Sequence, residues 1–410
     1  IEDEWNIKFP FEKLYTYETF NKFYELILEK MKDVDNKNEA KGKVEIISID
    51  DRYIPFELNS LQNLIYNSAL ANTNNSGWNL SVAIEMLGKL DIARMNTAIE
   101  NVVKKFECFR TIIIDDNKKP LQIVLPAVNT QLKIFDYTKE GYNKVIDTIE
   151  RKANTPINIL GKLPYQFELY IIGDESYIFF ANIHHIISDG SSLGILLENL
   201  NTEYMGAHDS KKIYQQMDFN HWINEFSDSQ EGKEQFSYWK ESLKNTSIVY
   251  EKTATKAEGK NVSLKVNVST DVIKLSEITK FNVFSILLTA FHIWIAYHNK
   301  VKYTYCTTVL ANRTKKEFKD VCGCLADLAP ICLEMNNCTV VELIGKTSRK
   351  IKEAVTNQEY PFIQIAANMN GSNHLAFEET AKYFIAFQNY KTRHLKLDEV
   401  DLKEILFLTS

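Results

Sequence analysis

The run from His184 to Gly190 reads His-His-Ile-Ile-Ser-Asp-Gly and brings together residue types that can move a proton. A neutral imidazole has a pKa of about 6.5 and can accept a proton from an attacking amine. Asp189 follows His185 by four positions and can pair with a cation that fixes the loop. Gly190 has no Cβ, so the chain can turn there and a substrate can pass close to it. The run predicts a proton-transfer site; a structural pair of buried histidines is the alternative.

Two extended segments and a helix are expected to position this run. Tyr165–Ile172 and Tyr177–Ile183 are apolar and rich in aromatic residues, and the Gly-Asp-Glu-Ser sequence between them is typical of a hairpin turn. Leu193–Tyr204 has apolar residues at helical spacing. Adjacent side chains on a strand point to opposite faces, so only one imidazole can face a shared cavity. We expect His185 to face that cavity and His184 to pack into the protein.

Helical and extended patterns alternate along the rest of the chain, on both sides of a midpoint near residue 225. A chain of 410 residues is too long for one ordinary core. The pattern therefore predicts a two-lobed α/β protein. The other expected helices are Leu61–Leu70, Ile92–Phe106, Val145–Ala153, Tyr238–Leu243, Phe281–Tyr297 and Val341–Asn357. The other expected strands are Asn79–Met86, Thr111–Ile114, Tyr303–Val309 and Tyr383–Asn389.

Composition limits the possible partners. The chain is 45% apolar and 25% charged, as in folded soluble proteins, and its net charge of −6 argues against a nucleic-acid surface. The longest apolar run, Phe284–Tyr297, is too short to cross a bilayer and contains His292, which predicts a buried helix. There is no pattern of a signal peptide. We expect a cytoplasmic protein without a nucleic-acid or membrane partner.

Six cysteines raise the question of a zinc site, because four of them fall within residues 322–338. Their spacing includes Cys-x-Cys but no Cys-x-x-Cys, and no histidine follows at ligand distance. The expectation is therefore reduced, mostly buried thiols and no bound metal.

Several further stretches, in order over residues 46–390, resemble motifs of the condensation domains of nonribosomal peptide synthetases, which belong to the chloramphenicol-acetyltransferase-like superfamily. The run from His184 to Gly190 matches the His-His-x-x-x-Asp-Gly motif of that family. The other matching stretches are Phe56–Gln62, Lys105–Thr111, Tyr214–Trp222, Tyr238-Trp239, Ala311–Arg313, Gly323–Leu325 and Gln358–Phe362.

This resemblance implies two acyltransferase-like lobes in a V-shaped arrangement with a tunnel between them. It also implies an upstream donor carrier and a downstream acceptor carrier from adjacent synthetase modules. Their 4′-phosphopantetheine arms enter from opposite mouths. His185 is then the catalytic imidazole, Gly190 lies beside the reacting carbonyl, and Asp189 is structural. Arg313 is the candidate partner of Asp189, with a solvated surface charge as the alternative.

The implied reaction is amide formation. The amine of the acceptor attacks the donor acyl or peptidyl thioester, in nonribosomal peptide or hybrid polyketide biosynthesis. An ester-forming domain, an epimerising domain and a catalytically silent carrier-docking domain are the alternatives. A heterocyclising domain is disfavoured, because it carries an Asp pair in place of His184 and His185.

The N-terminal segment resembles the back half of a carrier domain. Residues 20–31 have an apolar helical face, and residues 32–43 are polar and typical of a linker. The expected domains are a partial helical carrier at 1–31, the linker at 32–43, a first lobe at 44–224 and a second lobe at 225–410, incomplete at its end. The serine that carries phosphopantetheine in such carriers is not in the sequence.

Two positions depart from the family motifs. Ser191 stands where a Trp is usual, which widens the tunnel or has no effect. Asp327 stands where Asn is common, and it either adds a charge near the acceptor side or faces solvent.

Overall fold

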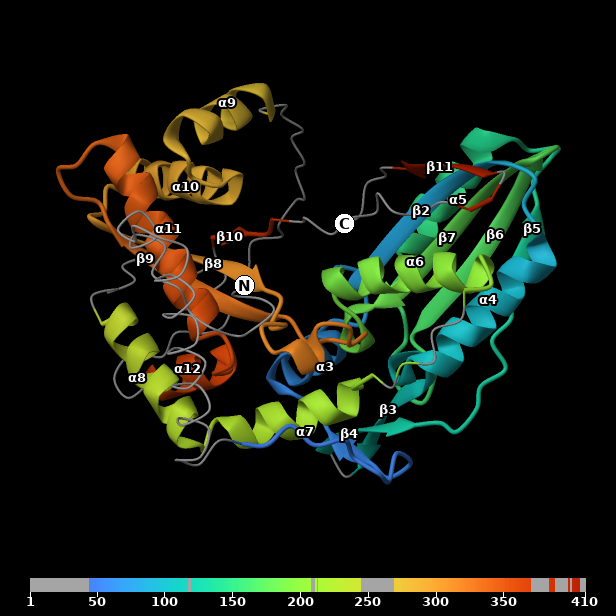
Figure 1. Cartoon of the computed structure of the whole chain (residues 1–410), viewed down its shortest axis with the longest axis horizontal. Coiled ribbons are helices and arrows are strands. Elements are labelled where there is room, and N and C mark those ends of the chain that lie inside the picture. Colours follow the sequence, from blue (N-terminus) through green and yellow to red (C-terminus); the bar gives the residue numbers. More distant parts are fainter. Residues whose placement is uncertain are drawn as a thin grey trace, which may run out of the picture.

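The structure is a computed structural model that describes residues 44–116, 119–207, 211, 213–244, 269–369, 383–387, 397–398 and 400–405. The expected carrier fragment at 1–31 and linker at 32–43 lie outside the described residues. Two α/β bodies rise from a common base and diverge from each other, which is the expected V-shaped arrangement (Figure 1).

The first lobe is built on a five-stranded sheet. In spatial order its strands are β11 (Val400–Ile405), β2 (Asn79–Gly88), β7 (Ser176–His184), β6 (Tyr165–Gly173) and β5 (Lys133–Asp136). The predicted hairpin is confirmed, because β6 and β7 are antiparallel neighbours. At the end of β7, His184 is paired with Asn79 of β2. The central strand of the lobe therefore leads directly to the motif.

Helices cover both faces of this sheet, which explains why its central strands are apolar without alternation. Along β7, Phe179 belongs to the core under α4 (Ile92–Lys105) and α6 (Gly190–Tyr204), while Phe180 belongs to the core under α5 (Tyr142–Ala153). This is the alternation of a strand buried on both sides.

Below the main sheet, a small second sheet and one helix complete the first lobe. The small sheet orders β1 (Phe56–Glu57), β4 (Lys119–Val124) and β3 (Thr111–Asp116), and the helix is α3 (Ser60–Ala71). A short 3-10 helix, η2 (Glu107–Arg110), leads into β3. Asn59 caps α3 in a capping box with Gln62, so this helix begins at a defined residue.

The second lobe has a three-stranded sheet and five helices among the described residues. The sheet orders β10 (Phe384–Ile385), β8 (Tyr303–Leu310) and β9 (Asp327–Glu334). The helices are α8 (Gln230–Leu243), α9 (Ser269–Thr279), α10 (Val283–Asn299), α11 (Val340–Thr356) and α12 (Phe362–Met369). Trp239, Leu288 and Ile331 are buried in its core.

One helix is less buried than expected. The run predicted as a buried helix forms α10, and Leu288 and Ile295 are indeed buried. However, Trp294 is 49% exposed and Tyr297 is 85% exposed, so the helix presents an aromatic face to solvent. Within the described part of the chain, no single helix meets the length and hydropathy of a membrane span; α9 and α10 meet them only when taken together across a 108° bend.

Side-chain packing and a segment of the second lobe also join the two lobes. The aromatic residues of α7 (Gln216–Phe226), among them Phe219 and Trp222, pack against Phe318 and Val321 of the second lobe. From Val321 to Ala326 the chain then crosses into the first lobe, where Cys322 and Cys324 lie in the core under α4 and α6. We call residues 321–326 the crossing segment.

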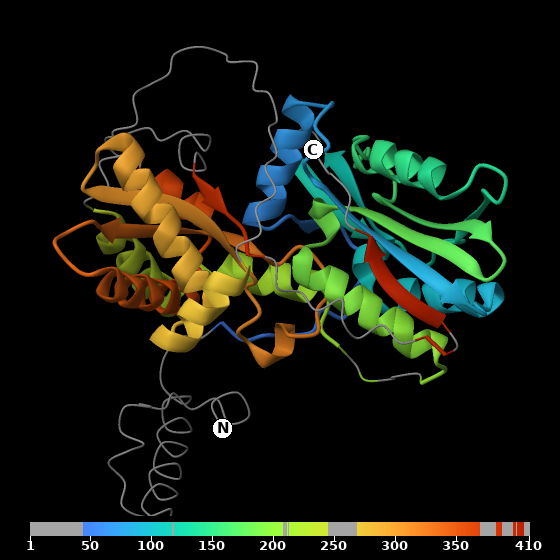
Figure 2. The same ribbon diagram turned by 90° about the horizontal axis from the view of Figure 1, so that it is seen from above.

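The last described strand departs from the expected division at residue 224. Residues 225–410 were all expected in the second lobe, but β11 pairs antiparallel with β2 of the first lobe, with Leu402 opposite Met86. In Figure 2 the red strand lies along the first lobe, apart from the other red and orange elements. The chain therefore returns to the first lobe twice, at the crossing segment and at β11.

Candidate functional site

The predicted motif forms a short connection between a strand and a helix. β7 ends at His184, a 3-10 turn η3 spans His185–Ile187, and α6 begins at Gly190. Asp189 is the N-cap of α6, and its Oδ1 accepts the N–H of Ser192 at 2.9 Å. An Asp at this position satisfies a backbone donor at the helix start, which explains where the helix begins.

His184 packs inside the first lobe, as expected. Its side chain accepts the N–H of Ile186 at Nδ1, at 3.2 Å, and the residue is 2% exposed. Burial, and to a smaller extent the neighbouring His185, lower the pKa of His184 to about 3. His184 is therefore a neutral acceptor that shapes the turn.

His185 lies where the two lobes meet and is half-buried. Its backbone N–H donates to the carbonyl of Trp78 at 2.7 Å. Nδ1 of its ring is 4.0 Å from Sγ of Cys324 in the crossing segment. Burial lowers the pKa of His185, and Asp189 and the carbonyls of His185 and Ser188 oppose that change in part. The ring is thus neutral at pH 7, the state that accepts a proton.

Asp189 and Arg313 form the expected ion pair. Oδ2 of Asp189 lies 2.8 Å from Nη1 of Arg313, and the side chains are 1% and 7% exposed. The same Oδ2 accepts the N–H groups of Leu325 at 3.0 Å and Ala326 at 3.1 Å. Burial alone would raise the pKa of Asp189, but Arg313 and the N–H groups of Ser192 and Leu325 outweigh it and hold the pKa below its ordinary value. The alternative of a solvated Arg313 is wrong.

Ser192 connects the motif to the crossing segment, and the sequence analysis did not identify it. Its Oγ lies 2.9 Å from Asp189 Oδ1, accepts the N–H of Gly323 at 2.9 Å and lies 2.7 Å from the Gly323 carbonyl. Nη2 of Arg313 donates to the same Oγ at 3.1 Å. The only signal was its place three residues after an N-cap Asp, which many helices share.

Three of the stretches that resembled family motifs meet behind the motif loop. Nε2 of Gln62 donates to the Ile186 carbonyl at 2.7 Å, and Nδ2 of Asn220 donates to Oε1 of Gln62 at 2.7 Å. Nδ2 of Asn59 donates to the Cys324 carbonyl at 2.8 Å. These amides attach α3 and α7 to the loop, so the stretches support the site.

The remaining predicted positions lie close by. Gly190 is the first residue of α6, and its φ is outside the left-handed region, so the turn does not depend on glycine through its backbone angle. Asp327 is 9% exposed, so the alternative in which it faces solvent is wrong. Its carboxylate accepts the N–H of Leu328 at 2.7 Å and that of Phe362 at 3.1 Å, at the start of α12. Burial raises the pKa of Asp327 to about 6.

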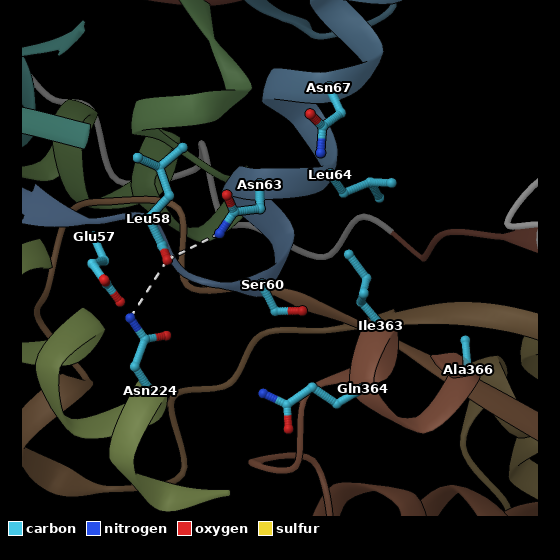
Figure 3. A pocket seen from close by; sticks show the side chains of 10 residues that line it. All are labelled: Glu57, Leu58, Ser60, Asn63, Leu64, Asn67, Asn224, Ile363, Gln364 and Ala366. Atoms are coloured by element: carbon cyan, nitrogen blue, oxygen red, sulfur yellow. Dashed lines mark hydrogen bonds between the residues drawn. The ribbon is translucent and has the colours of Figure 1, made fainter. Parts of the chain in front are cut away.

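A pocket lies between α3 of the first lobe and α12 of the second lobe (Figure 3). Its volume is about 630 Å³, and both lobes contribute to it. It is lined by Glu57, Leu58, Ser60, Asn63, Leu64, Asn67, Asn224, Ile363, Gln364 and Ala366. His185 is not one of these residues. Within the residues that the structure describes, no group of three or more His, Cys, Asp or Glu side chains is arranged to hold a metal ion.

The pocket is polar on the side of α3. Nδ2 of Asn63 and Nδ2 of Asn224 donate to the Leu58 carbonyl at 3.1 and 3.4 Å. Oγ of Ser60 is buried and has no hydrogen-bond partner. Such a surface can hydrogen-bond an elongated ligand that carries amide groups.

Comparison with known proteins identifies the family. The sequence model of the Condensation domain family matches residues 55–407. Tyrocidine synthase 3 of Brevibacillus parabrevis is 25% identical over 295 residues, which cover 70% of this chain and 4% of that protein. Surfactin synthase subunit 1 of Bacillus subtilis (strain 168) is 24% identical over 306 residues, which cover 72% of this chain and 8% of that protein. The chain thus spans only a small part of these relatives.

Solved structures have the same fold at low sequence identity. The first condensation domain of the CDA synthetase matches with a TM-score of 0.68 and 12% identity, over 86% of each chain. The starter condensation domain of rhizomide synthetase, as a mutant in complex with C8-CoA, matches with a TM-score of 0.72 and 12% identity, over 86% of this chain and 83% of that one. The match over residues 55–407, together with this fold and the arrangement around His185, shows that the chain belongs to the condensation domain family.

Proposed function

We propose that this chain forms an amide bond between two carrier-bound substrates. An acyl or peptidyl group arrives as a thioester on an upstream carrier, and the amine of the acceptor arrives on a downstream carrier. The amine attacks the thioester carbonyl, the new C–N bond forms, and the carrier thiol leaves. The carriers belong to adjacent modules of a nonribosomal peptide synthetase, the class of protein that the name of one relative states.

The observation that carries this proposal is the position of His185. A neutral imidazole lies at the junction of the lobes, on a loop that is fixed from both sides. Its Nδ1 side is covered by Cys324, which leaves Nε2 for the reacting amine. His185 then accepts the proton that the amine must lose, while the ion pair of Asp189 with Arg313 keeps the loop in place.

The pocket between α3 and α12 fits the arm of a carrier. A 4′-phosphopantetheine arm is long, narrow and contains two amide groups, and it supplies the thiol that carries the substrate. The amides of Asn63, Asn67 and Gln364 and the unpartnered hydroxyl of Ser60 provide complementary donors and acceptors. The pocket is lined by one face of α3, while Gln62 on the opposite face of the same helix donates through Nε2 to the Ile186 carbonyl of the motif loop. We propose that one of the two arms passes through this pocket.

A product assay tests the proposed function. Carrier domains loaded with a panel of acyl and aminoacyl groups are mixed with the chain, and the carrier-bound products are identified by intact-protein mass spectrometry. Amide product on the downstream carrier, with the upstream carrier discharged, supports the proposal. An ester product, a product of inverted configuration without condensation, or carrier binding without any product from the whole panel contradicts it.

A further inference from the structure

Cys324 covers one side of the His185 ring and belongs to the other lobe. Its Sγ lies 4.0 Å from Nδ1 of His185. The indole of Trp78 meets the same ring at 88°, with 5.9 Å between the ring centroids. The imidazole therefore lies between a residue of the first lobe and a residue of the crossing segment, in addition to its polar neighbours, the carbonyls of His185 and Ser188.

Hydrogen bonds of its backbone fix the position of Cys324. Its N–H donates to Oε1 of Gln216, and its carbonyl accepts from Nδ2 of Asn59 at 2.8 Å. The residue is completely buried. Because protein interiors are closely packed, a side chain held in this way has little room to withdraw. The position of the Cys324 sulfur atom beside the His185 ring is therefore fixed.

The Cys324 thiol is neutral. Burial raises its pKa well above the ordinary value, and the negative charges of Asp189 and Asp327 act in the same direction. A neutral thiol is only a weak donor and a weak acceptor, so it forms no ion pair with the imidazole. Its effect on His185 is that of contact, because it occupies the space beside Nδ1.

We propose that Cys324 is a positioning residue for His185, whose side chain keeps the imidazole turned so that Nε2 faces the reacting amine. The inference rests on the proposed function, in which His185 accepts the proton. Alanine at this position removes the atom that touches Nδ1, so the ring can rotate and water can reach it. Because a misplacement of about 1 Å can reduce a rate by about 100-fold, the loss appears in kcat more than in KM.

Two substitutions at Cys324 and one matched control test the kinetics. Cys324→Ala removes the γ atom, and Cys324→Ser retains a γ atom that can contact the ring. Cys322→Ala is the control: Cys322 is also completely buried in the crossing segment, and its Sγ faces the Ser192 carbonyl at 3.8 Å instead of His185.

Cys324→Ala is expected to lower kcat by about 10- to 100-fold and to shift the acidic limb of the rate profile to higher pH, since less burial raises the pKa of His185. Cys324→Ser is expected to retain most of the rate. Cys322→Ala is expected to keep the wild-type pH profile. Identical kcat values and pH profiles for Cys324→Ala and Cys322→Ala overturn the inference.

A spectroscopic readout separates this inference from the proposed function. In protein labelled with ¹⁵N at histidine, the His185 signals are those absent from His185→Ala. Wild type is expected to show one tautomer, and Cys324→Ala is expected to show ring shifts averaged over two. If the ¹⁵N shifts of the His185 ring are unchanged in Cys324→Ala, the positioning role is wrong, whatever the rate of condensation. If His185→Ala retains full activity while the shifts change as expected, the proposed proton-accepting role of His185 fails and the orienting role of Cys324 stands.

Discussion

Asp189 of the first lobe and Arg313 of the second form a buried ion pair, with 2.8 Å between Oδ2 and Nη1. Removing one member leaves the other charge buried and unpaired, which typically costs about 3–5 kcal/mol. We therefore expect Asp189→Ala to lower the free energy of unfolding by about that amount, measured by urea denaturation. Asp189→Ala combined with Arg313→Ala is expected to cost less than the sum of the single changes, because no charge is then left unpaired.

An exposed ion pair provides the control for this prediction. Lys119 and Glu57 are 2.7 Å apart, but their side chains are 62% and 61% exposed. Solvent screens such a pair, so Lys119→Ala is expected to leave the unfolding curve unchanged. An Asp189→Ala protein as stable as Lys119→Ala would contradict the structural role of the buried pair.

Two buried histidines predict a loss of stability in acid. Burial lowers the pKa of both His184 and His292 to about 3. In the unfolded chain a histidine binds its proton at about pH 6.5, so between that pH and about pH 3 only the unfolded state is protonated. Stability therefore falls as the pH is lowered through this window, by about 1.4 kcal/mol per pH unit for each histidine.

His292→Asn isolates one of these histidines. Asn keeps a polar atom near Oγ1 of Thr304, which lies 2.8 Å from Nδ1 of His292, and it cannot be protonated. Between pH 6 and pH 4, the free energy of unfolding of this variant is expected to fall less steeply than that of wild type. The difference between the two slopes is about 1.4 kcal/mol per pH unit. Direct NMR titration of the histidine signals is the second measurement, and a His292 signal that titrates above pH 5 would exclude the explanation.

Asp327 is expected to change the stability with pH in the direction opposite to that of the two histidines. Burial raises its pKa to about 6 from 3.8, so the folded state holds the proton more tightly than the unfolded state does. Its contribution to stability is present below pH 3.8 and is lost as the pH rises through about 6. A shift of this size corresponds to roughly 3 kcal/mol.

Asp327→Asn should therefore gain stability relative to wild type as the pH rises from 4 to 7. Leu328 and Phe362 donate to different oxygens of Asp327, and in Asn one of these oxygens is replaced by an NH2 group that cannot accept. The test is therefore how the stability difference between Asp327→Asn and wild type changes with pH, and not its size at one pH. Asp147→Asn, at an exposed position in the middle of α5, is the matched control. A difference between Asp327→Asn and wild type that stays constant with pH would refute the raised pKa.

The pocket leads to a prediction about substrate delivery. Ala366 of α12 lines it, so Ala366→Trp fills space that the proposed arm needs. The variant is expected to lose most of the product formed with loaded carriers, with an unfolding curve close to that of wild type. Val341→Trp, at an exposed position of α11, is the control. Wild-type turnover of Ala366→Trp with every loaded carrier would show that neither arm uses this pocket.

Local patterns were sufficient to predict the hairpin of β6 and β7, the helices α4 and α5, and the loop that carries His185, because these depend on neighbours in the chain. The ion pair of Asp189 with Arg313 was also predictable, but only through the resemblance to a family, since 124 positions separate the two residues.

The features that were missed depend on distant segments. Nothing in Val400–Ile405 indicates that it pairs with β2, and a short strand has no signal for its partner. The contact of Cys324 with His185 exists only because the crossing segment enters the first lobe. The exposure of Tyr297 was not predicted, because an apolar run in the sequence does not show which of its side chains the fold covers.

The rate of condensation by His185→Ala tests the central claim most directly. Wild type, His185→Ala and the control His298→Ala, exposed on the second lobe, are compared with both carriers loaded, and carrier binding is measured in parallel. A positioned general base contributes about 10²–10⁴-fold, so we predict a loss of that order for His185→Ala, unchanged carrier binding and full activity of His298→Ala. A His185→Ala protein that condenses every tested pair at the wild-type rate would contradict the account and leave the imidazole with a structural role only.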